Sequence, residues 1–237
     1  MFQRLFNTLT GGEKTTAVEN LFAHSTPSTD FYLMIVLSVL MATFGLLADS
    51  SAVIVGSMLI APILYPTLGL AMGMIMSDLP LTSKSFATLF KATLLAIVVS
   101  ALVTLLFSSQ IGQTSGEILA RTKPSLLYAA IGVIAGFAAA FAMAKPKLSE
   151  TLPGVAISVA LVPPLAVVGI GLARFDINMA TSSLLLFIIN AAGVVFAAAT
   201  VFSLMNFYIK RTVAEATVKE EEKKIEQVEE RAETSAK

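Results

Sequence analysis

The chain has 237 residues and a formal net charge of zero, which removes the electrostatic argument for nucleic acid as a partner. Hydrophobic residues make up 56% and charged residues 14%, and 15 of the 32 charged residues lie in 210–237, so too few charges remain elsewhere to cover a soluble domain. With no cysteine and one histidine, His24, the composition excludes disulfides and thiolate sites, and we expect no metal and no cofactor.

Residues 1–30 mix charged, glycine and hydroxyl residues without a signal-peptide core, and we predict a short cytoplasmic segment. Six apolar runs follow, at 31–47, 52–76, 85–107, 126–143, 152–173 and 179–207. Crossing a bilayer takes about 20 apolar residues in a helix, and the runs lack the alternation of barrel strands. The sequence therefore predicts an all-α polytopic membrane protein, with six transmembrane helices within 31–209 and a charged cytoplasmic helix or tail at 210–237.

Basic residues near the predicted spans favour cytoplasmic termini. With six crossings, one side carries Arg4, Lys14, Lys84, Lys145, Lys147, Lys210 and Arg211, and the other carries Arg121, Lys123 and Arg174. Making the second and fifth runs re-entrant hairpins weakens this bias to six against four, so we favour full crossings. The predicted location is the inner (cytoplasmic) membrane, with several spans.

The second and fifth runs resemble each other at an offset of 102 residues, which aligns Pro62 with Pro164. The same offset brings the first run near the fourth and the third onto the sixth. The chain thus reads as two three-helix repeats, 31–107 and 126–207. Because three crossings is an odd number, the second repeat enters the membrane with opposite polarity, as in many secondary transporters.

Prolines interrupt both of these runs, at Pro62 and Pro66 in one and at Pro163 and Pro164 in the other. A proline inside a helix removes a backbone hydrogen bond and clashes with the preceding turn. We therefore expect helices 2 and 5 to be broken near the membrane midplane. Broken helices at matching places in two repeats indicate a substrate site, although a simple packing kink has the same sequence pattern.

At these prolines the sequence resembles a family of bacterial and archaeal hydrophobic membrane proteins known as a numbered domain of unknown function. The first motif is Asp49-Ser-Ser-Ala-Val-Ile-Val-Gly56-Ser-Met-Leu-Ile-Ala-Pro62, with Asp49 where the family most often has asparagine. The second is Pro153-Gly-Val-Ala-Ile-Ser-Val-Ala-Leu-Val-Pro-Pro164. The resemblance covers most of 30–210 and implies an inner-membrane location without an assigned activity.

A few polar residues are candidates for a binding site or pore. Asp49, Ser50 and Ser51 open the second run, where free N–H groups could bind an anion or where these residues are a plain N-cap. Tyr65 places a hydroxyl between two prolines, either for substrate or for a freed carbonyl. Asn190 lies deep in the sixth run and either lines a pore or bonds across helices.

We expect a transporter or channel for a small solute or ion, with its site at the proline-broken helices 2 and 5. No intramembrane protease motif or nucleotide fingerprint is present, so we expect no enzymatic activity. The alternative is an oligomeric scaffold that organises lipid or a partner. A lipid-acting enzyme centred on Asp49 and Ser50 is a weaker third hypothesis. The expected partners are the lipid bilayer, the solute and further copies of the chain.

Overall fold

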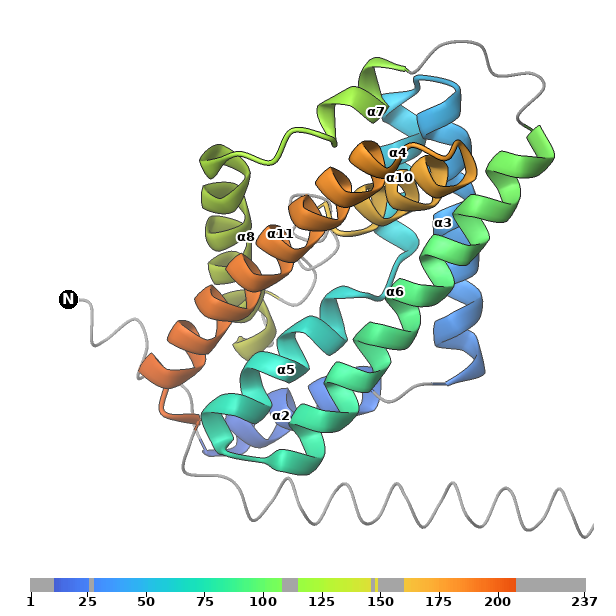
Figure 1. Cartoon of the computed structure of the whole chain (residues 1–237). Helices are drawn as coiled ribbons and strands as arrows, with labels where there is room; N and C mark the ends of the chain where they lie inside the picture. The colour runs from blue at the N-terminus through green and yellow to red at the C-terminus, as the bar shows by residue number, and fades with distance from the viewer. Residues whose placement is uncertain (1–10, 26–27, 108–114, 146–147, 149–159, 208–237) are drawn as a thin grey trace, which may run out of the picture.

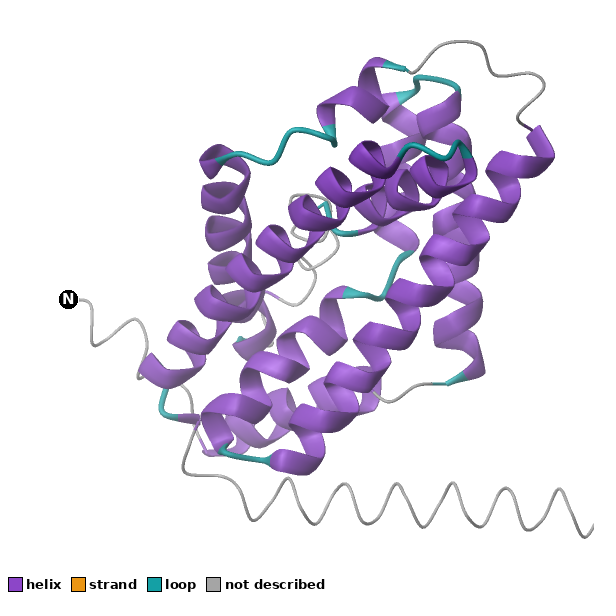
Figure 2. Ribbon diagram, in the orientation of Figure 1, coloured by secondary structure: helices purple, strands orange, loops and turns teal. Residues whose placement is uncertain are grey.

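The computed structural model describes residues 11–25, 28–107, 115–145, 148 and 160–207, and this part of the chain is all-helical (Figures 1 and 2). Its helices are α2 (Gly11–Ser25), α3 (Thr29–Leu47), α4 (Ser51–Ile60), α5 (Leu64–Met76), α6 (Leu79–Phe107), α7 (Gly116–Ala120), α8 (Leu126–Ala144), α10 (Val162–Ala173) and α11 (Ile177–Leu204). The predicted all-α class is confirmed for these residues. The predicted tail at 210–237 lies outside them.

Four helices, α3, α6, α8 and α11, are long and apolar enough to cross a membrane. The pair α4 and α5 passes the same test together, with a bend of 51° at the break between them. Helix α10 has 12 residues, fewer than the roughly 20 that a span needs. Five of the six predicted runs thus coincide with described apolar helices. The predicted fifth span begins at 152, and its residues before 160 lie outside the described part.

The outer surface of α6 is apolar along its length. Phe86, Phe90, Leu94, Val98 and Leu102 follow one another at intervals of four residues, and each exposes about half of its side chain. Residues four apart share one face of a helix, so these side chains form a continuous stripe. A soluble monomer rarely exposes such a stripe, whereas lipid chains solvate it well.

Two corners between helices have the same construction. After α5, the Asp78 N–H donates to the Gly73 carbonyl at 2.9 Å, and the Asp78 carboxylate accepts from the Leu81 N–H. After α10, the Asp176 N–H donates to the Gly171 carbonyl at 2.8 Å, and the Asp176 carboxylate accepts from the Met179 N–H. This pattern is a Schellman motif followed at once by an N-cap, and it satisfies backbone groups at both helix ends within a short turn.

The glycines are needed in these corners because the next helix passes very close. A Cβ on Gly73 would lie 2.8 Å from the Thr82 nitrogen, and a Cβ on Gly171 would lie 2.8 Å from the Ala180 nitrogen. The residue just before the aspartate of each corner, Ser77 or Phe175, has a positive φ. Glycine therefore permits the close approach here, while the left-handed position is occupied by residues with side chains.

Helix bounds repeat at an offset of 98 residues. Helices α5 and α10 begin at 64 and 162, and helices α6 and α11 begin at 79 and 177, a difference of 98 in both pairs. The offset of 102 that the sequence suggested is therefore not the register of the described helices. In the observed register Pro66, not Pro62, corresponds to Pro164, because both occupy the first turn of their helix.

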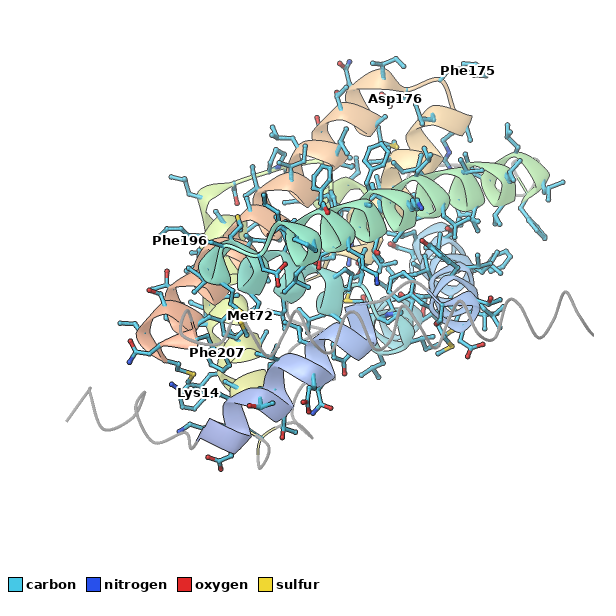
Figure 3. The ribbon with its side chains drawn as sticks, turned by 90° about the horizontal axis from the view of Figure 1, so that it is seen from below. Lys14, Met72, Phe175, Asp176, Phe196 and Phe207 are labelled. Carbon is cyan, nitrogen blue, oxygen red and sulfur yellow. The ribbon has the colours of Figure 1, made fainter. Side chains whose placement is uncertain are left out.

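Helix α2 lies across one end of the bundle (Figure 3). It packs against α5, α6 and α8 through Ala17, Val18 and Leu21, which are all buried. Lys14 donates to the Asn206 carbonyl at 3.5 Å, and its ammonium lies 5.8 Å from the centre of the Phe207 ring. A cation is stabilised at the C-terminal end of a helix, and Lys14 occupies that position beyond α11.

Candidate functional site

The break between α4 and α5 is a well-defined interruption in the middle of the bundle (Figure 2). Helix α4 ends at Ile60, Ala61 is extended with φ −73° and ψ 119°, and α5 begins at Leu64. Pro62 lies in the gap and has no N–H, so it cannot donate to the Met58 carbonyl four residues earlier. The predicted broken helix 2 is therefore present, and Pro62 is its local cause.

The other three prolines begin helices instead of interrupting them. Pro66 is the third residue of α5, and Pro163 and Pro164 are the second and third residues of α10. First-turn N–H groups have no intrahelical acceptor, so proline costs nothing there. This explains how two adjacent prolines fit in an apolar helix without distorting it. The fifth helix is predicted to break at Pro163 and Pro164, but these residues lie in the first turn of α10, and 149–159 before them lie outside the described part of the chain.

Hydroxyl side chains satisfy part of the backbone around the break. Ser38 on α3 donates to the Ser57 carbonyl at 2.7 Å, inside the last turn of α4. Thr67 donates to the Ile63 carbonyl at 2.8 Å, and the Tyr65 N–H donates to the Pro62 carbonyl at 3.3 Å. All of these residues except Tyr65 and Pro62 are buried; those two are half-buried. The break is thus partly satisfied and partly accessible.

The structure places the Asn190 turn of α11 against α8. A Cβ on Gly132 would lie 3.2 Å from the Asn190 carbonyl oxygen, and a Cβ on Gly136 would lie 2.6 Å from the Val194 Cα. Asn190 is 4% exposed. Its backbone therefore takes part in a tight helix–helix contact built on small residues, and both interpretations of its side chain stay predictions.

The residues at the start of α4 form a separate cluster from the break. Helix α4 has 10 residues, so its start and its end are about 15 Å apart. Ser50 is the N-cap of α4 but makes no capping bond with its side chain. The Asp49 carboxylate instead accepts the Glu117 N–H at 2.9 Å, in the first turn of α7. Asp49 therefore supports the first turn of α7, whose N-cap is Ser115, and Ser50 occupies the N-cap position of α4 without a side-chain bond.

Glu117 and Arg121 complete this cluster, which we name the α7 clasp: Asp49, Ser51, Ser115, Glu117 and Arg121. Ser51 donates a hydrogen bond to the Glu117 carboxylate, and Arg121 pairs with that carboxylate at 2.5 Å. Ser115 donates to the Leu46 carbonyl at 2.6 Å. Sequence reasoning missed the last three residues, because 66 residues separate Ser51 from Glu117 and no local pattern joins them.

The α7 clasp predicts a pH effect on stability. The pKa of Glu117 lies below its usual 4.5, because the Ser51 hydroxyl and then Arg121 hydrogen-bond the carboxylate. A carboxylate whose pKa is lowered by folding stabilises the folded state at pH values above its unfolded-state pKa. This contribution is lost as the pH falls through its folded-state pKa. The Glu117 carboxylate contributes up to about 1 kcal/mol to the free energy of unfolding. We therefore expect the Tm of Glu117→Gln to decline less steeply below about pH 4.5 than the Tm of the parent chain. Identical pH profiles of Tm for the two proteins would contradict the role of the clasp.

Residues 58–196 match the model of the family described as "Domain of unknown function (DUF389)". An uncharacterised protein of Methanocaldococcus jannaschii is 30% identical over 176 residues. The similarity covers 74% of this chain and 54% of that protein, so the chain spans about half the length of this curated relative. No solved structure matches the chain.

Proposed function

Because the chain belongs to the DUF389 family, whose description assigns no activity, we propose a function from the geometry: it is a membrane transporter or channel for a small solute or ion. The site is the α4–α5 break together with the start of α10, near the membrane midplane. The chain is not an enzyme in this proposal. The observation that carries it is the 51° break at Pro62 in the middle of an apolar bundle.

Two features support an inverted-repeat transporter architecture of six spans. The helix bounds repeat at an offset of 98 residues, from 64 to 162 and from 79 to 177. The α5–α6 corner lies beside α2, whereas the equivalent α10–α11 corner lies at the opposite end of the bundle, near α7 (Figure 1). Repeats of opposite polarity place equivalent corners at opposite ends, and their broken helices meet at a shared site.

The irregular backbone at the break also favours a transporter. Unpaired backbone groups are tolerated within a membrane only where protein buries them or water lines them. Pro62 and Tyr65 are half-buried, so these residues keep part of their surface accessible. In the proposed orientation the protein lies in the cytoplasmic membrane with both termini inside, and α2 rests on the cytoplasmic face. Further copies of the chain surround it, because six short-looped helices enclose little volume.

Flux through reconstituted protein tests this function. We expect Pro62→Ala to lower solute flux in proteoliposomes by about tenfold or more, because the alanine N–H restores the Met58 bond and straightens α4 onto α5. A loss of about 1.4 kcal/mol in binding already gives tenfold. Pro80→Ala is the matched control, since Pro80 is exposed in the first turn of α6 at the end of the bundle.

Assembly must be measured beside flux, by the elution volume and Tm of each purified variant. Loss of flux in Pro62→Ala at unchanged Tm supports the assigned site. Full flux in that variant overturns the site. A parent protein that passes no ion or small solute of any charge overturns the function and favours the oligomeric scaffold.

A further inference from the structure

Resting on the proposed function, we propose that the α4–α5 break selects a monovalent cation, which it holds with main-chain carbonyl oxygens. The inference comes from a one-sided distribution of hydrogen-bonding groups at the break. Acceptors are freed there, prolines remove some of the donors, and no charged side chain lies on α4, α5 or α10.

The acceptors come from the last turn of α4. Helix α4 ends at Ile60, so the carbonyls of Met58, Leu59 and Ile60 have no intrahelical donor, and for Met58 this follows directly from Pro62. The carbonyl before them, on Ser57, already accepts from Ser38 at 2.7 Å. A helix C-terminus also carries about half a negative charge. Three carbonyls at such an end form an environment suited to a cation.

Prolines remove part of the donors from the helices that begin nearby. The first turn of a helix normally offers N–H groups to an anion. In α5 the third residue is Pro66, and the Tyr65 N–H is taken by the Pro62 carbonyl at 3.3 Å. In α10 the second and third residues are Pro163 and Pro164. Both helix starts lie in the middle of the molecule (Figure 2), and α10 packs against α4.

The absence of charged side chains on these helices further limits which ligands the break can bind. Helices α4, α5 and α10 contain no Asp, Glu, Lys, Arg or His. Divalent cations in proteins are usually held by carboxylates, and anions by N–H donors or positive charge. The basic residue Lys91, on the neighbouring α6, is exposed. Neutral carbonyls replacing a hydration shell select monovalent cations, as in potassium-selective filters.

The test is ion selectivity in proteoliposomes that contain the full chain. The probes are K⁺, Na⁺, Cl⁻ and glycerol, with reversal potentials for the ions and light scattering for glycerol. We expect permeability to K⁺ or Na⁺ and none to Cl⁻ or glycerol. Permeability to Cl⁻ or glycerol without cations overturns the inference and leaves transport standing. No permeability to any of the four overturns the inference, and the proposed function falls with it only if no other ion or small solute passes either.

Adding one donor back gives a sharper readout than loss of flux. Pro163→Ala restores an N–H in the first turn of α10, so the ratio of cation to Cl⁻ permeability should fall while the protein stays assembled. Pro80→Ala adds the equivalent N–H at the second position of α6, outside the site, and should leave the ratio unchanged. If Pro163→Ala does not fold, Pro66→Ala makes the same change in α5. An unchanged ratio in the folded variant overturns the role of the prolines.

Discussion

Replacing Gly169 with alanine is expected to destabilise the protein strongly, because α10 and α6 touch at that residue. A Cβ there would lie 2.5 Å from the Ile97 carbonyl oxygen and 2.8 Å from the Ala101 nitrogen. Both are backbone atoms of α6, so no side-chain rotation can relieve the overlap. The helices must separate, which also stretches the 2.7 Å bond from Ser100 to the Ala166 carbonyl.

Overpacking of this kind costs about 1–3 kcal/mol, and a rigid backbone contact belongs at the upper end. Thermal unfolding in detergent, followed by circular dichroism, measures the loss. Gly56→Ala is the matched control: a Cβ on Gly56 would meet only the flexible end of Met41, at 3.6 Å. Alanine favours a helix over glycine by about 1 kcal/mol, so the control should keep or gain stability. A shift of the same sign and size in both variants would contradict the close α6–α10 contact.

Truncating Leu21 to alanine is expected to release α2 from the end of the bundle. Leu21 is fully buried, and it shares its contact surface with Val18 and Ala17. Deleting a buried leucine side chain costs about 2–5 kcal/mol, which is large for a 15-residue helix docked by one short face. Short helices have little stability without such contacts, so release should also unfold α2.

Trypsin cleavage after Lys14 detects the release. In the parent protein Lys14 contacts the Asn206 carbonyl and the Phe207 ring, and cleavage should be slow (Figure 3). Leu21→Ala should accelerate it by about tenfold for each 1.4 kcal/mol of docking free energy lost. Glu19→Ala, on the exposed face of the same helix, is the control and should cleave at the parent rate. Equal rates in all three proteins would show that Leu21 does not hold α2.

The corners show what sequence reasoning could have found and did not. Aligning apolar runs by identity gave an offset of 102, because leucine, valine and alanine match often by chance. The pattern of a glycine followed five residues later by aspartate, Gly73 with Asp78 and Gly171 with Asp176, gives 98. A corner requires a glycine at the close contact and a capping side chain after it. These residues therefore indicate how the two repeats align better than the lipid-facing residues do.

The prolines show a limit of a different kind. A proline in the middle of an apolar run predicts an interruption, and Pro62 confirms that expectation. The same rule does not distinguish a proline that breaks a helix from one that begins the next helix. Pro66, Pro163 and Pro164 are of the second kind. The distinction depends on where the neighbouring backbone leaves the helix, which is decided by packing against other helices.

The sequence by itself determined the helical class, the places of the apolar segments and the break at Pro62. These follow from local properties: hydrophobic length set by a bilayer, and a backbone nitrogen without hydrogen. Only the tertiary structure decided that Asp49 accepts the Glu117 N–H of α7, that Asn190 packs on α8 and that α10 meets α6 at Gly169. Each of these contacts joins residues tens of positions apart in the chain. Their pairing is set by how whole helices pack, and no local pattern of residue types encodes it.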